Sequence, residues 1–186
     1  EVDRPFIKSK YSQHKRNYHK YKIDFLKLPG KEKKIDQSIK ILENRFLGKK
    51  DFAINYLNNN SYRKTEKKFL HNNKKTICLF LHNTADSLFG FPSMNFHQQK
   101  DWIKKTLGMF DGNIKDKFNI LVKIHPNETL QGELYLKKII SNFPFSIAVD
   151  KNVNNYLIIN SNLVAGITLH GSVGLELAFH KIPTIY

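Results

Sequence analysis

The 186-residue sequence contains a single cysteine, Cys78, and few acidic residues. One cysteine excludes an internal disulfide framework and a cysteine-rich metal site. No apolar run approaches the roughly 20 residues of a membrane-spanning helix, and residues 1–20 lack the apolar core of a signal peptide. Hydrophobic residues still make up 40% of the chain, with 14 Phe and 8 Tyr, which argues against a wholly disordered protein. We therefore expect a soluble protein of a reducing compartment, long enough for one α/β domain and an appendage.

Basic residues are abundant and unevenly distributed. The chain has 31 Lys and Arg against 16 Asp and Glu, a formal net charge of +15. Residues 1–75 carry 21 basic and 8 acidic side chains, whereas residues 76–186 carry 10 and 8. Such a surplus suits an anionic lipid surface, a nucleic acid or an acidic polymer. The alternative is a solvated lysine-rich face, because the aromatic residues of this part do not repeat as a base-stacking platform would.

The first 74 residues read as a basic helical segment or linker. Residues 1–30 are basic and irregular, and the turn signal Leu28-Pro29-Gly30 closes them. Apolar residues at helical spacing predict a helix over residues 35–47, and residues 51–70 repeat the pattern more weakly. Because their apolar faces are narrow, we expect these helices to lean on another surface.

The pattern changes over residues 75–186. The continuous apolar run 76–81 is typical of a strand buried on both faces of a parallel sheet. Predicted elements alternate after it: strands over residues 118–124, 145–149, 163–167 and from 183 onward, and helices over residues 97–110, 128–141, 156–159 and 171–179. This alternation predicts βαβ units, and hence an α/β fold with a parallel, doubly wound sheet.

Three polar clusters follow predicted strands, at residues 82–87, 125–128 and 168–172. Ligands of such sheets bind outside the carboxyl ends of the strands. Each cluster alone can be a structural turn. Three of them at one edge of a sheet favour a binding site.

The last cluster runs into Gly171-Ser172-Val173-Gly174, where a helix is expected to start. Glycine lets the backbone approach a ligand closely, and free N–H groups at a helix start favour an anion such as phosphate. Ser172 adds a hydroxyl donor, and Glu176 can accept hydrogen bonds from ribose hydroxyls. The alternative is a serine N-cap that binds nothing. The segment matches neither a Walker loop nor the dinucleotide fingerprint.

His125 is the best single candidate for chemistry. Pro126 restricts the backbone of His125 and holds its imidazole at the end of a strand. Histidine can donate to a phosphate oxygen or pass a proton to a leaving group near neutral pH. Lys123 lies on the same face of the strand and adds positive charge. The alternative is a histidine that only ends a strand.

These motifs resemble a known family. The segments 123–128, 168–176 and 180–185, with the upstream Leu81–Ser87 and Asp101-Trp102-Ile103, are similar to bacterial capsule and surface polysaccharide biosynthesis proteins. Those proteins are GT-B glycosyltransferases related to Kdo transferases, and they share the His-Pro motif with bacterial sialyltransferases. The resemblance covers residues 75–186.

The resemblance implies that residues 75–186 are the Rossmann-like, nucleotide-sugar-binding lobe of a two-lobed glycosyltransferase. By this resemblance His125 contacts the nucleotide phosphate and acts as a general acid toward it. Ser172 in its glycine turn holds phosphate, and Glu176 binds ribose. Asp86 is a weaker catalytic candidate that contacts acceptor or donor. The implied donor is a CMP- or UDP-linked sugar, the acceptor is a polysaccharide or a lipid-linked sugar, and neither a metal nor another cofactor is implied.

The sequence departs from the family in two places. His180-Lys181 stands where Gly-Lys is usual, and the chain ends at Tyr186 inside a predicted strand, which suggests a fragment. Residues 1–74 are expected to be helices and a linker, and the protein is expected to be cytoplasmic and peripheral to the inner membrane. Two alternatives remain: a basic nucleic-acid- or membrane-binding module with the sheet as scaffold, and a sugar-nucleotide epimerase of GT-B architecture. Zinc spacing, helix-turn-helix signals and RNP-type aromatics are absent, which makes nucleic acid the weaker partner.

Overall fold

The computed structural model describes residues 13–46, 74–84, 98–169 and 171–185. The chain divides into two compact units, residues 1–41 and 42–186. Helix α1 (Gln13–Leu26) and the greater part of helix α2 (Lys31–Phe46) belong to the first unit. The helix expected over residues 51–70 lies outside the described residues.

Helix α1 corrects the expectation of irregular structure over residues 1–30. Residues 13–26 contain neither glycine nor proline, so nothing in the segment breaks a helix. Their apolar residues do not form a single narrow stripe, which is why periodicity did not reveal the helix. The turn expected at residues 28–30 is confirmed, since Gly30 has φ +65°, a left-handed conformation that favours glycine. Helix α2 begins at the next residue, earlier than its apolar periodicity indicated.

The second unit is an α/β layer structure built around five parallel strands. The strands are β1 (Lys75–Phe80), β2 (Phe118–Lys123), β3 (Ser146–Val149), β4 (Leu163–Ile167) and β5 (Thr184–Ile185). The helices between them are α3 (Gln99–Gly108), α4 (Asn113–Lys117), α5 (Leu130–Ile140), α6 (Asn155–Ile159) and α7 (Val173–Phe179). The predicted α/β class and all five predicted strands are confirmed.

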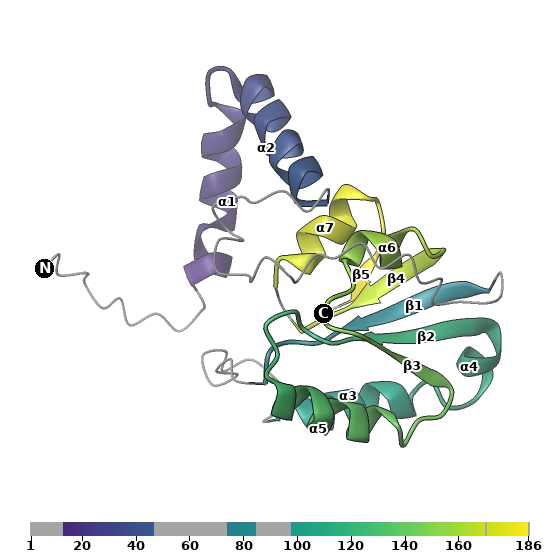
Figure 1. Ribbon diagram of the computed structural model, residues 1–186. Coiled ribbons are helices and arrows are strands. Elements are labelled where there is room, and N and C mark those ends of the chain that lie inside the picture. Colours follow the sequence, from purple (N-terminus) through teal and green to yellow (C-terminus); the bar gives the residue numbers. More distant parts are fainter. Residues whose placement is uncertain (1–12, 47–73, 85–97, 170, 186) are drawn as a thin grey trace, which may run out of the picture. The chain divides into compact units, whose positions relative to one another are not determined.

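The order of the strands in the sheet is β3-β2-β1-β4-β5 (Figure 1). The chain moves outward from β1 to β3, then returns to place β4 on the other side of β1. The direction of winding therefore reverses between β1 and β4. At such a switch point the loops leave the sheet in opposite directions, and ligands of open α/β sheets bind there.

Helices cover both faces of the sheet (Figure 1). One buried cluster joins the sheet to α3 and α5, with Trp102, Ile103 and Leu136 among its members. The second joins the other face to α6 and α7 through Ile158 and Leu177. Alternate residues of β1 and β2 belong to the two clusters, which explains why these two strands are continuous apolar runs in the sequence.

Helix α4 was not expected. It has five residues, four of them polar, and it leads directly into β2, so it has no apolar periodicity to recognise. Among the helices described, none combines the length and the apolar character needed to cross a membrane.

Candidate functional site

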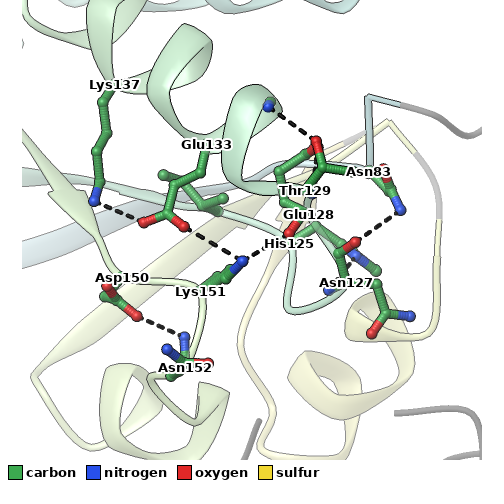
Figure 2. Close-up of polar contacts among 12 residues, drawn as sticks. Asn83, His125, Asn127, Glu128, Thr129, Glu133, Lys137, Asp150, Lys151 and Asn152 are labelled. Carbon is green, nitrogen blue, oxygen red and sulfur yellow. Dashed lines mark hydrogen bonds and ion pairs between the residues drawn. The ribbon is translucent and has the colours of Figure 1, made fainter. Parts of the chain in front are cut away.

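The loops that follow β1, β2, β3 and β4 all lie at the carboxyl edge of the sheet, because the strands are parallel. Two of the three polar clusters are described in part, as residues 82–84 and 168–169 with 171–172, and the cluster at 125–128 is described in full. Asp86 and His170 lie outside the described residues. Polar side chains from the loops after β1, β2 and β3 meet in Figure 2.

His125 leaves the end of β2 in a closed turn. The N–H of Glu128 donates to the carbonyl of His125 (3.0 Å), and the N–H of Asn127 donates to His125 Nδ1 (3.2 Å). A neutral imidazole whose Nδ1 accepts a hydrogen bond carries its proton on Nε2. The ring is half-buried. His125 is therefore held by its own turn with Nε2–H as the donor, the state expected of a group that donates to phosphate.

Glu128 joins this turn to the loop after β1. Its Oε2 accepts the backbone N–H of Thr84 (2.7 Å), and its Oε1 accepts the Thr84 hydroxyl (2.7 Å) and the backbone N–H of Thr129 (3.0 Å). Asn83 adds a second link, since its Nδ2 donates to the carbonyl of Asn127 (3.1 Å). Sequence reasoning assigned Glu128 no role. An acidic residue two positions after the His125-Pro126 pair was the only signal that the sequence offered.

The loop after β3 is also bonded to this turn (Figure 2). Lys151 Nζ donates to the carbonyl of Glu128 (2.8 Å) and pairs with Glu133 on α5 (3.4 Å). Glu133 also pairs with Lys137, one helical turn further along (2.7 Å). Lys151 was not identified from the sequence, because nothing in its neighbourhood forms a motif.

Lys123 lies inside the protein. Its side chain is on the α6–α7 face of β2, where 3% of the residue is exposed, and its Nζ donates to the carbonyls of Ile124 (2.6 Å) and Lys151 (2.9 Å). Burial lowers the pKa of Lys123 to about 8, although nearby Cys78, Asp150, Glu176 and Glu133 favour its charged form. The ammonium group of Lys123, which the sequence placed toward a ligand, is therefore buried beneath the edge of the sheet and donates to main-chain carbonyls.

Gly171 brings the loop after β4 against the loop after β1. Its φ of +116° is a conformation that side chains with a Cβ rarely adopt. A Cβ at this position would lie 3.2 Å from Cε1 of His82, a buried residue at the end of β1. The two loops on either side of the switch point are thus in close contact, and glycine is needed at the point of contact.

Ser172 and Val173 begin α7 beside this contact. Ser172 is exposed, has helical backbone angles, and makes no side-chain capping hydrogen bond. Ser172 is the N-cap residue of α7, as the alternative reading has it, but its hydroxyl makes no capping hydrogen bond to the helix. Pro126 is half-buried in the His125 turn.

Glu176 lies on α7 below the edge. The residue is 5% exposed, and its Oε2 accepts a hydrogen bond from Asn155 Nδ2 on α6 (2.9 Å). Glu176 also acts electrostatically on Lys123. The structure therefore places Glu176 and Lys123 in one buried polar group under the sheet edge, whereas His125 and Ser172 lie at the edge itself.

The described residues contain no group of three His, Cys, Asp or Glu side chains arranged to hold a metal ion. What the edge offers is a set of hydrogen-bond donors: an imidazole, an exposed hydroxyl and a glycine turn. Such a set is suited to an anion rather than to a cation. Neither a family model nor a curated protein sequence matches this chain, so its function has to be inferred from the residues at the carboxyl edge.

Proposed function

We propose that residues 75–186 form the nucleotide-sugar-binding lobe of a glycosyltransferase of capsule or surface polysaccharide synthesis. The observation on which this depends is the contact between Gly171 and His82 at the β1–β4 switch point, with His125 on the next strand along the same edge. This position is where open α/β sheets bind nucleotides. The donors found there suit the phosphate of such a ligand.

In the proposed reaction the oxygen of an acceptor hydroxyl attacks the anomeric carbon of the donor sugar and releases its proton to water. The bond from that carbon to the phosphate oxygen breaks, and its electron pair passes to the phosphate. His125 Nε2–H donates to the oxygen that gains this charge, and Ser172 donates to a second phosphate oxygen. Donors already in place cost no reorganisation as charge develops, so they stabilise the transition state more than the bound substrate.

The buried polar group has a different part in the proposal. Lys123 is separated from any ligand by the carbonyls that it contacts, so it acts through its charge and by holding the loops after β2 and β3. Glu176 orders the α6–α7 side through Asn155. A direct contact of Glu176 with ribose stays a prediction from the sequence.

The test is nucleotide binding by titration calorimetry, with CMP and UDP as the probes. We expect both the wild-type chain and a His19→Ala control on α1 to bind at least one of them. His125→Ala should bind that nucleotide about tenfold or more weakly, the loss expected for a hydrogen bond to a charged group. Because His125 is half-buried in a loop, thermal melting of the variant should stay close to wild type.

Two results would contradict the proposal in different ways. If neither nucleotide binds at millimolar concentration, the lobe does not bind a nucleotide. If a nucleotide binds equally well to wild type and to His125→Ala, the protein binds a nucleotide but His125 does not contribute to the binding.

We also propose that the basic segment associates peripherally with an anionic membrane surface. Three apolar side chains of α1 are largely exposed: Tyr21 (61%), Ile23 (50%) and Leu26 (56%). Lys20 precedes Tyr21 in the sequence, and Lys22 lies between Tyr21 and Ile23. Apolar side chains among lysines favour a lipid surface over a nucleic acid, which offers no apolar interior to such side chains. Each lysine contributes about 1 kcal/mol near an anionic leaflet.

Vesicle sedimentation checks this second proposal. The chain should sediment with phosphatidylserine-containing vesicles more than with phosphatidylcholine vesicles, and added salt should release it. Lys20→Glu with Lys22→Glu should abolish the difference, whereas Lys104→Glu with Lys138→Glu on the sheet unit should preserve it. Equal recovery on both kinds of vesicle would count against the proposal.

A further inference from the structure

Glu128 is a buried carboxylate in a loop, which is an uncommon place for a charge. The residue is 3% exposed. Removing a carboxylate from water is strongly unfavourable unless hydrogen bonds replace the lost hydration. Here the replacement is extensive: Oε2 has one donor within 3.0 Å and Oε1 has two, from Thr84 and Thr129.

Both carboxylate oxygens accept a main-chain N–H group. Oε2 accepts the N–H of Thr84, and Oε1 accepts the N–H of Thr129. A glutamine in this place has a single acceptor oxygen, and its amide group would meet one of these N–H groups donor to donor. The position therefore requires a carboxylate, not merely a polar side chain of the same shape.

Glu128 joins Thr84, in the loop after β1, to the stretch between β2 and α5, where its carboxylate accepts the N–H of Thr129 and its own backbone N–H closes the turn on His125. Thr129 is the N-cap of α5, and its hydroxyl accepts the N–H of Gly132 (3.0 Å). The carboxylate thus ties the loop after β1 to the loop after β2. Its negative charge is directed at donors inside the protein, so it does not oppose an anion bound at the surface.

We propose that Glu128 is a positioning residue for the binding of a nucleotide phosphate. By holding Thr84 and the 125–128 turn together, it keeps His125 Nε2 and Thr84 in one arrangement, so that the ligand does not have to order these two residues. This inference rests on the proposed nucleotide-binding function. Groups that are already in place bind a ligand more tightly, because less conformational freedom is lost on binding.

Three variants test the role. Glu128→Gln should weaken binding of the nucleotide found by calorimetry about tenfold. Thr84→Val, which removes the hydroxyl but keeps the backbone N–H, should weaken it about threefold, and Thr84→Ser, which restores a hydroxyl, should bind as wild type does. Rescue by serine separates positioning by the hydroxyl from a general effect of changing residue 84. The Thr84 pair also decides the question if Glu128→Gln does not fold.

Hydrogen exchange of the Thr84 amide is measured in the same proteins without nucleotide. We expect faster exchange in Glu128→Gln than in wild type, because the acceptor of that amide is altered. Equal nucleotide affinity in wild type, Glu128→Gln and Thr84→Val would overturn the inference while leaving the proposed function intact. Absence of nucleotide binding in wild type would overturn the proposed function, and the positioning role with it.

Discussion

Replacement of Gly132 by alanine should destabilise the protein by about 2–4 kcal/mol, although Gly132 lies in the first turn of α5, where alanine would normally favour the helix by up to ~1 kcal/mol. A Cβ at Gly132 would overlap Oε1 of Glu128 and lie 2.7 Å from the Thr84 hydroxyl oxygen. Making room moves a buried carboxylate away from its donors, and the combined cost of overpacking and lost hydrogen bonds exceeds the gain in helix propensity. Urea unfolding measures the change.

Gly108 provides the matched control, since it is the last residue of α3 and a Cβ there would meet no atom within 4 Å. Gly108→Ala should be neutral or stabilising. A second check combines Glu128→Asp with Gly132→Ala. The shorter side chain of aspartate leaves room for the Cβ at residue 132. The double variant should therefore lose less free energy of unfolding than the sum of the losses in the two single variants. A Gly132→Ala protein as stable as wild type would show that the Glu128 side chain is not packed against α5 as described.

The second large effect concerns Lys123 and pH. Burial lowers the pKa of Lys123 to about 8 from the 10.5 that is usual for lysine. Between these two values the unfolded chain holds a proton that the folded protein has released, so the Lys123 contribution to stability rises with pH. At 1.36 kcal/mol per pKa unit the rise is about 3 kcal/mol. The free energy of unfolding of wild type, minus that of Lys123→Met, should therefore increase by about this amount between pH 7 and pH 10.5.

Subtracting the free energy of unfolding of Lys123→Met from that of wild type cancels the contributions of the other groups that titrate between pH 7 and pH 10.5. Burial raises the pKa of Cys78, so its thiol stays protonated in both folded proteins and its contribution cancels. Lys104→Met, at an exposed lysine of α3, is the control and should give a pH profile parallel to that of wild type. Parallel profiles for Lys123→Met as well would mean that the Lys123 ammonium group is in contact with water.

Hydrophobic patterning of the sequence predicted the α/β class and the five strands. Residues 76–81 and 118–124 are nearly continuous apolar runs because both faces of their strands are covered, and a pattern of this kind needs no tertiary information to be recognised. The carboxyl-edge rule then selected the loops that follow these strands as the candidate site. Patterning failed where no apolar stripe is required, as in helix α1 and in the five-residue helix α4.

The partners of the polar side chains came from the tertiary structure alone. His125, Ser172 and the glycine turn were identified from local sequence, because each belongs to a short motif next to a predicted strand. Glu128 and Thr84 are 44 residues apart, and nothing in either segment indicates that they are bonded. Lys123 looked like a ligand-facing charge, but its strand position points it into the α6–α7 layer.

The sequence by itself thus determined which residues form strands and which polar residues stand at their carboxyl ends, since both depend on the burial pattern along a continuous segment. Only the tertiary structure decided the strand order β3-β2-β1-β4-β5, and with it that the loops after β1 and β4 meet at His82 and Gly171. The physical reason is that a hydrogen bond or a packing contact between distant segments depends on how strands pair. Parallel strands of similar apolar character carry no local signal of which neighbour each will take.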